Sequence, residues 1–99
     1  MATPARLTDV EIAARLEALP GWSLEGGKLH KAFAFTDFVE AWGFMSAVAL
    51  VAEAMGHHPE WCNVWSRVTV DLTTHDTGGI SVLDFNLAAR MESLAEKRS

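Results

Sequence analysis

The sequence has only one cysteine, Cys62, and it has eight lysine and arginine residues against thirteen aspartate and glutamate residues. A lone cysteine forms no intrachain disulfide, so the fold does not depend on an oxidising compartment. The net charge of −5, with no run of basic residues, argues against a nucleic-acid-binding face. No basic residue near Cys62 in the sequence would activate its thiol, so we interpret Cys62 as a core residue.

Segments that would target the chain to a membrane or to secretion are also missing. Residues 1–8 contain no apolar stretch, so we expect no secretory signal in them. The longest uncharged run in a helical pattern, residues 41–52, has 12 residues, whereas a bilayer-spanning helix needs about 20. We therefore expect a cytoplasmic protein that does not bind membranes.

What remains is the composition of an ordinary globular protein. Of the 99 residues, 49% are hydrophobic and 21% are charged, and repeats, linkers and low-complexity stretches are absent. We expect a single domain over residues 1–99, in which residues 1–7 form a flexible N-terminal tail.

Three helices are predicted from their capping signals, in which Ser, Thr or Asp is followed three residues later by an acidic residue. The first helix is predicted to end at Pro20-Gly21, and the second to run to about Met55 with Gly56 as its C-cap. The capping pairs are Thr8 with Glu11, Asp37 with Glu40, and Ser81 with Asp84.

The second predicted helix is apolar on nearly every side. A helix of this kind must be buried on all sides, and one small sheet cannot cover it. We therefore infer that it contacts another subunit. Its large apolar residues are Phe38, Val39, Trp42, Phe44, Met45, Val48, Leu50 and Val51.

Alternating residues predict the strands. A short strand at Trp22–Leu24, a turn at Gly26-Gly27 and an alternating run over Lys28–Phe35 predict a hairpin. Residues 63–73 read as one long strand, with Val68 and Val70 on its apolar face. Residues 74–79 form a loop. The predicted fold class is α+β, an antiparallel sheet with helices gathered on one face.

Three of the four histidines lie just outside regular elements. His57 and His58 follow a helix, and His75 follows the predicted long strand. Glu53 precedes His57 by four residues, so the two share a face if the helix persists that far, and the carboxylate would then hold the imidazole. Histidines that converge in a pocket can divide the roles of proton donor and proton acceptor near neutral pH.

Each of these residues also has a simpler interpretation when it is taken alone. His30, the His57-His58 pair and Glu53 can be ordinary surface residues, and Asp84 can serve only as a helix cap. Trp61 and Trp65 can be packing residues. On the predicted strand Trp65 shares a face with Arg67 and Asp71, so we expect a subunit or a ligand to cover it.

Together, the order and spacing of these residues resemble the signature of the pterin-4a-carbinolamine dehydratases, also called 4a-hydroxytetrahydrobiopterin dehydratases. The resemblance covers roughly residues 8–95. The signature positions are Glu53, His57, His58, Pro59, Trp65, His75 and Asp84. The flanking words that resemble the family are Gly21-Trp22, Phe44-Met45, Gly56-His57-His58-Pro59-Glu60-Trp61, Asn63-Val64-Trp65, Thr73-Thr74-His75 and Asp84-Phe85-Asn86-Leu87-Ala88.

This resemblance implies a four-stranded antiparallel sheet with about three helices packed on one face, assembled into a homodimer or a homotetramer. It implies dehydration of a 4a-hydroxytetrahydropterin, the pterin left by an aromatic amino acid hydroxylase, to a quinonoid dihydropterin. A functional link to such a hydroxylase follows. Members of the family use neither a metal nor an organic cofactor.

The resemblance also implies the site residues. His58 and His75 are expected to act as the acid and base pair, with His57 orienting the pterin and Glu53 supporting His57. The expected substrate-contacting residues are Trp22, Gly56, His57, His58, Thr73, Thr74, His75 and Asp76, and the expected supporting residues are Pro59, Trp65 and Asp84. The chain departs from the mammalian relatives at Gly56, where they carry an acid, and at Val82-Leu83, where they carry charged residues.

Two other functions fit parts of the sequence. Three histidines and a glutamate could hold zinc, although the consecutive side chains of His57 and His58 diverge and seldom meet at one ion. A non-catalytic interaction role, as a coactivator or an assembly factor, is the main alternative. Such a role would tolerate loss of the histidines, and all three are present.

Overall fold

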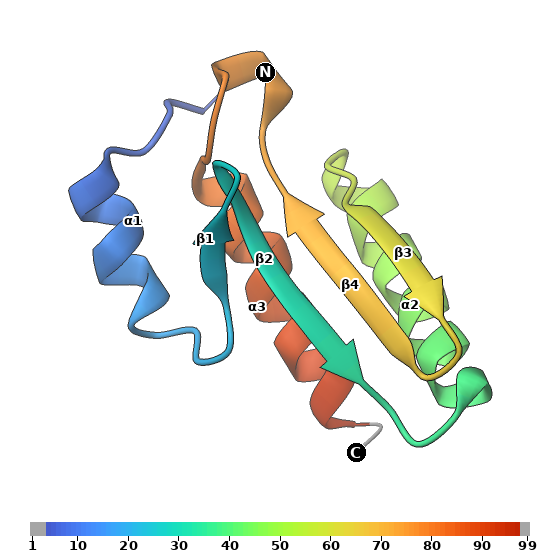
Figure 1. The fold of residues 1–99 in the computed structure, drawn as a ribbon. Helices are drawn as coiled ribbons and strands as arrows, with labels where there is room; N and C mark the ends of the chain where they lie inside the picture. The colour runs from blue at the N-terminus through green and yellow to red at the C-terminus, as the bar shows by residue number, and fades with distance from the viewer. Residues whose placement is uncertain (1–3, 98–99) are drawn as a thin grey trace.

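The computed structural model describes residues 4–97, which form an antiparallel sheet and three α-helices (Figure 1). The strands lie in the order β1-β2-β4-β3, and every neighbouring pair is antiparallel. The predicted α+β class with a four-stranded antiparallel sheet is therefore confirmed. In chain order the elements are α1 (Asp9–Leu16), β1 (Ser23–Glu25), β2 (Lys28–Ala34), α2 (Phe38–Met55), β3 (Glu60–Val64), β4 (Arg67–Leu72), the 3₁₀-helix η1 (His75–Thr77) and α3 (Val82–Glu96).

The three predicted capping signals all start helices. The side chains of Thr8 and Ser81 form reciprocal capping boxes with the acidic residues three positions later, and Asp37 accepts a hydrogen bond from the Glu40 N–H. The end of α1 was predicted too late. The helix ends at Leu16, and residues 17–19 already form turns and a bend before the Pro20-Gly21 signal is reached.

The core lies between the sheet and the two longer helices, α2 and α3, which lie side by side across one face of the sheet (Figure 1). Alternate residues of the two central strands face these helices, as the alternation predicted. The helix α1 lies beside β1, and its Ile12 joins the same core. Fully buried side chains of the core include Leu29, Phe44, Val48, Val68, Val70, Leu72, Leu87 and Met91.

The helix α2 buries one side and exposes apolar residues on the other. Phe44, Val48 and Ala52 are fully buried, whereas Trp42 and Leu50 are 56% and 77% exposed. In length and composition α2 could cross a membrane, a test that core helices of soluble proteins also pass. The cytoplasmic location and the absence of membrane binding stay predictions.

The predicted long strand over residues 63–73 is wrong. The chain instead forms a hairpin in which Trp65 and Ser66 connect β3 to β4. The turn carries no glycine, and Trp65 itself adopts a positive φ of 52°, which non-glycine residues rarely do. The amide of Asn63 closes the turn by donating to the carbonyl oxygens of Trp65 and Arg67.

Two further expectations change with this hairpin. Trp65 lies at the hairpin tip and is 70% exposed, so it does not share a strand face with Arg67.

The interpretation of Cys62 as a core residue is also wrong. Cys62 pairs with Thr69 in the β3–β4 register, on the face turned away from the helices, and it is exposed. The buried positions Val68 and Val70 pair instead with the neighbours of Cys62.

Backbone hydrogen bonds hold the residues that follow β4 and part of the N-terminal segment. Thr74 and Gly79 form an isolated bridge around η1, where a plain loop was predicted. Part of the predicted tail over residues 1–7 lies outside the described residues, namely residues 1–3. At its other end, the Leu7 N–H donates to the Ile80 carbonyl at 2.8 Å. The flexible tail and the single-domain boundaries stay predictions.

Candidate active site

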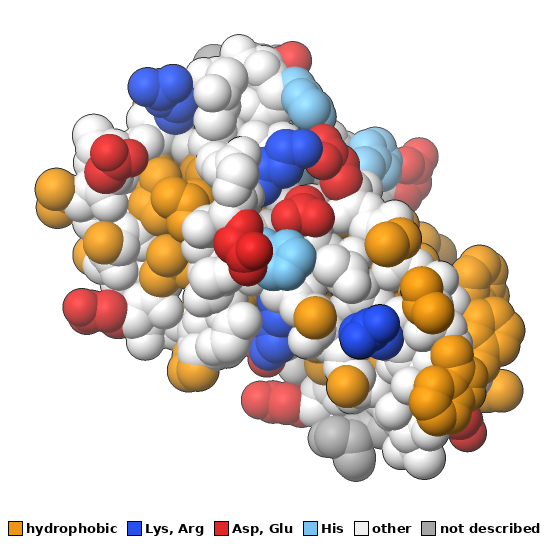
Figure 2. All heavy atoms as spheres, viewed as in Figure 1, with side chains coloured by type: hydrophobic (Ala, Val, Ile, Leu, Met, Phe, Trp, Pro, Cys, Tyr) orange, Lys and Arg blue, Asp and Glu red, His pale blue; other side chains and the backbone are white. Residues whose placement is uncertain are grey.

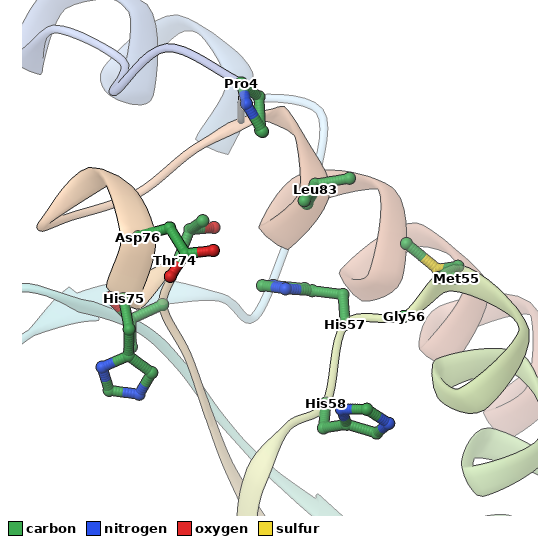
Figure 3. Close-up of a pocket in the computed structure, with 10 residues that line it drawn as sticks. Pro4, Met55, Gly56, His57, His58, Thr74, His75, Asp76 and Leu83 are labelled. Atoms are coloured by element: carbon green, nitrogen blue, oxygen red, sulfur yellow. The ribbon is translucent and has the colours of Figure 1, made fainter. Parts of the chain in front are cut away.

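A hollow of about 560 Å³ opens between the C-terminal end of α2 and the segment that follows β4 (Figure 3). Three histidines from two distant parts of the sequence, His57, His58 and His75, line it. Every residue of the two stretches expected to contact substrate, residues 56–58 and 73–76, is part of the lining. The full lining is Pro4, Met55, Gly56, His57, His58, Thr73, Thr74, His75, Asp76 and Leu83.

Gly56 determines how the two adjacent histidines are presented. It ends α2 as the predicted C-cap with a φ of 66°, and its N–H donates to carbonyl oxygens of the last turn. Because the chain leaves the helical path here, His57 and His58 do not continue the helix. Figure 3 shows the His57 ring directed across the pocket toward Thr74, while the His58 ring points away from the pocket centre.

His57 is fixed by a buried carboxylate. Its Nε2 lies 2.6 Å from Oδ1 of Asp84, and Asp84 is fully buried. The other oxygen of Asp84 accepts from the Thr74 hydroxyl at 2.8 Å and from the Ser81 N–H at 2.9 Å. A buried carboxylate must have such partners to offset its lost hydration. Asp84 therefore caps α3 and holds His57 at the same time.

The expected support of His57 by Glu53 is wrong. Glu53 Oε1 lies 2.8 Å from Nε2 of His58, and both side chains are exposed. The expectation required the helix to continue to His57, and the left-handed residue Gly56 prevents this. Glu53 does not line the hollow, but it holds a histidine that does.

His75 pairs with a residue that the sequence did not single out as part of the site. Its Nε2 lies 3.1 Å from Oε2 of Glu60, and Glu60 Oε1 accepts a hydrogen bond from Lys28. This hydrogen bond, with the attraction of Lys28 and His75, lowers the pKa of the Glu60 carboxyl. Glu60 stands in the Gly-His-His-Pro-Glu-Trp word, but only the unpredicted β3–β4 pairing brings it to His75.

Three other expected residues do not line the hollow. Trp22 is buried in the core, where its indole N–H donates to Glu92 at 2.8 Å. Trp65 lies at the tip of the β3–β4 hairpin, and Pro59 connects His58 to β3. Leu83, one of the residues where the chain departs from the mammalian relatives, is part of the lining.

The arrangement suits acid–base chemistry. Each histidine of the hollow has a carboxylate at one ring nitrogen: Asp84 at His57, Glu53 at His58 and Glu60 at His75. A carboxylate orients an imidazole and supports its protonated form. Within residues 4–97, no three His, Cys, Asp or Glu side chains are grouped so that they could hold a metal ion.

Sequence comparison connects this site to one family. The family model described as pterin 4 alpha carbinolamine dehydratase matches residues 5–94. A protein of Solibacter usitatus, provisionally named pterin-4-alpha-carbinolamine dehydratase, is 52% identical over 91% of this chain and 95% of its own. A protein of Novosphingobium aromaticivorans with the same provisional name is 54% identical over 92% and 97%.

Solved structures agree with the sequence matches. A protein of Brucella melitensis described as a transcriptional coactivator/pterin dehydratase has a TM-score of 0.88 and 43% identity, over 91% of this chain and 98% of its own. A pterin dehydratase-like protein identified as a RuBisCO assembly factor in the alpha-carboxysome has a TM-score of 0.66 and 28% identity, over 78% and 92%. The chain therefore belongs to the pterin 4 alpha carbinolamine dehydratase family.

Proposed function

We propose that this protein removes water from a 4a-hydroxytetrahydropterin and releases a quinonoid dihydropterin. The observation that carries the proposal is the meeting of three histidines, each with its own carboxylate, around one hollow. Membership of the pterin 4 alpha carbinolamine dehydratase family supports the same reaction.

The reaction requires one proton to be supplied and one to be removed. The bond between carbon 4a and its hydroxyl oxygen breaks, and the oxygen leaves as water after it accepts a proton from an imidazolium. The neighbouring ring N–H gives its proton to a neutral imidazole, and its electron pair forms the new C=N bond. The two histidines then regain their starting states by exchanging protons with solvent.

We assign the acid and base roles to His58 and His75, and the orienting role to His57. His57 is buried and tied to a fully buried carboxylate, which suits a group that must stay in place. The other two rings are exposed, so they can exchange protons with water. The His58 ring points away from the pocket centre in this structure, so the proposal requires it to turn toward a bound pterin. We further infer that residues 56–58 and 73–76 contact the pterin.

The test is a stopped-flow absorbance assay of 4a-hydroxytetrahydropterin dehydration. We expect the wild-type protein to accelerate the reaction, and His58→Ala and His75→Ala to lower kcat by about 10²- to 10⁴-fold. His30→Ala is the matched control, since His30 lies on the sheet and outside the hollow. A wild-type rate equal to the buffer rate would overturn the proposed function.

The proposed reaction places the protein in the recycling of the pterin used by an aromatic amino acid hydroxylase, in the cytoplasm. Acid–base groups alone complete the chemistry, so we propose no metal and no organic cofactor. A genome neighbourhood that encodes such a hydroxylase would support this link.

We also propose that the protein works as a homodimer or a homotetramer. The support is the outer face of α2, where large apolar side chains meet solvent in a single chain: Phe38, Val39, Trp42 and Leu50. Figure 2 shows hydrophobic side chains along this edge of the molecule. An exposed patch of this kind on a small domain is typical of an interaction surface.

The second candidate is a non-catalytic interaction role. The same outer face of α2 favours it, and two structural relatives are described as a coactivator and as an assembly factor. A stable complex with a transcription factor or an assembling enzyme, without any acceleration of dehydration, would support this role in place of catalysis.

A further inference from the structure

The face of the sheet turned away from the helices carries a row of charged side chains that leads to His75. The strand register places Glu60 of β3 opposite Asp71 of β4, and Asp71 opposite His30 of β2. Lys28 lies two residues before His30, on the same face. Figure 2 shows acidic, basic and histidine side chains gathered over this part of the molecule.

Glu60 uses its two oxygens for two different partners. Oε1 accepts from Nζ of Lys28, and Oε2 lies 3.1 Å from Nε2 of His75. Lys28 belongs to β2 and Glu60 to β3, the two strands that flank β4. The carboxylate is therefore anchored across the sheet and still reaches the histidine beyond the end of β4.

This contact fixes the chemistry of the His75 ring. An ionised carboxylate only accepts hydrogen bonds, so the His75 Nε2 facing it must carry a proton. The hydrogen bond from Lys28 lowers the pKa of Glu60 and keeps the carboxyl ionised at neutral pH. Among the residues that the structure describes, none is hydrogen-bonded to Nδ1 of His75, so that atom is open to another group.

The corresponding pair at His58 lacks such an anchor. The Glu53 side chain is 82% exposed, and among residues 4–97 it is hydrogen-bonded only to His58. The Glu60 side chain is 41% exposed and bonds to two partners. An isolated exposed pair is weak, while charges joined in a network hold their geometry better. Glu60 is therefore the better placed of the two to hold a ring.

We propose that Glu60, anchored by Lys28, is a positioning residue that keeps His75 with its proton on Nε2 and leaves Nδ1 to accept the proton of the substrate. The inference rests on the proposed dehydration and deepens it, because it makes His75 the base and leaves His58 as the acid. A bound pterin would exclude water from the ring, and the carboxylate contact strengthens as water leaves.

The first test reads the His75 tautomer without any turnover. Protein labelled with ¹⁵N-histidine is studied by long-range ¹H–¹⁵N NMR at a pH where the rings are neutral, and His75 is assigned from the signal that His75→Gln lacks. We expect an Nε2–H signature in the wild type and a mixture of tautomers in Glu60→Ala. Glu25→Ala, which removes a carboxylate from the same face without touching His75, should keep the wild-type signature.

The second test follows activity in the same variants. We expect Glu60→Ala to lower kcat by about tenfold with KM nearly unchanged, since an incorrectly protonated base slows the proton step rather than binding. The kcat of Lys28→Met should lie between those of Glu60→Ala and the wild type, and Lys28→Arg should have nearly the wild-type kcat. Circular dichroism verifies that each variant is folded.

The outcomes separate this inference from the proposed function. A wild-type proton on Nδ1, or a Glu60→Ala variant with an unchanged tautomer or an unchanged kcat, would overturn the role of Glu60 even when the wild type is active. A wild-type protein that does not dehydrate the pterin would overturn the proposed function and the assigned base with it, whatever the tautomer.

Discussion

Nε2 of His57 lies 2.6 Å from Oδ1 of Asp84, at the one carboxylate of the site that is fully buried. Asp84 also accepts a hydrogen bond from the N–H of Ser81, the N-cap residue of α3. One side chain thus starts a helix and holds a histidine of the candidate active site, so its removal should disturb both stability and activity.

We predict that Asp84→Ala lowers the free energy of unfolding by about 3 kcal/mol, because it leaves the buried groups that hydrogen-bond to the carboxylate without a partner. We expect kcat to fall as well. Urea denaturation and the dehydration assay measure the two effects. Asp37→Ala is the matched control. It removes the cap of α2 away from the hollow, and it should cost only about 1 kcal/mol with no change in rate. Equal losses in both variants would contradict the added role of Asp84.

Acid should remove the contribution of the Lys28–Glu60 pair to stability. The hydrogen bond from Lys28 lowers the pKa of Glu60 below its ordinary value of 4.5 in the folded protein. A depressed folded pKa gives a contribution that is present above the unfolded pKa and is lost as the pH falls through the folded pKa. At the alkaline end the pKa of Lys28 is raised by Glu60, so its contribution is lost only as the pH rises through that folded value.

The measurement is a double-mutant cycle of Glu60→Gln and Lys28→Gln, followed by urea denaturation. The coupling free energy should be favourable at about pH 7 and should decrease as the pH is lowered below 4.5, through the folded pKa of Glu60. A coupling that stays constant over this range would show that the two side chains do not interact through their charges.

A charge on the outer face of α2 should separate the subunits. Trp42 and Leu50 are 56% and 77% exposed in the single chain, and burying a glutamate in their place at an apolar contact is costly. We expect sedimentation velocity to show a dimer or tetramer for the wild type and a monomer for Trp42→Glu or Leu50→Glu. Val10→Glu, at an apolar position on α1 that is 80% exposed, should not change the assembly. A monomeric wild type would contradict the proposed assembly.

Relief of the positive φ at Trp65 should stabilise the hairpin. A left-handed backbone costs a non-glycine residue roughly 1–2 kcal/mol, and glycine adopts it without this penalty but loses more chain entropy on folding. We therefore expect Trp65→Gly to raise the unfolding free energy by up to about 1 kcal/mol. Ser66→Gly, beside it in the turn but without a positive φ, should lower that free energy. A higher unfolding free energy for Ser66→Gly than for Trp65→Gly, measured by thermal or urea unfolding, would rule out strain at Trp65.

The parts of the fold that could be predicted from sequence depend on local signals. The starts of all three helices follow from a capping side chain and the acid three residues later, because both partners lie within one helical turn. The β3–β4 hairpin could not be predicted in the same way. Its turn is built on Trp65 and Ser66, which form none of the dipeptides that mark a two-residue hairpin turn, and Asn63 supplies the closing hydrogen bonds.

In the candidate active site, too, some features could be predicted from the sequence and others could not. Residues 56–58 and 73–76, which the family resemblance indicated, line the hollow, but Pro4 and Met55 of the lining were not predicted, and neither were the pairings of the histidines. The contact between Glu60 and His75 depends on strand pairing, which no sequence interval reveals. The pairing of Glu53 with His57 could have been rejected from sequence, because a helix that ends at Gly56 cannot carry His57 on its face.

The outer face of α2 and the residues that follow its C-terminal end can change independently in evolution. Its outer face carries apolar side chains, and its C-terminal end leads to the histidines of the hollow. His58 and His75 are exposed and contribute little to packing, whereas His57 and Asp84 are buried. If the protein has the proposed activity and the proposed partner on α2, a descendant that keeps the partner but no longer needs catalysis can lose His58 and His75 first. It would retain the fold, the surface and the buried pair as the remains of an enzyme.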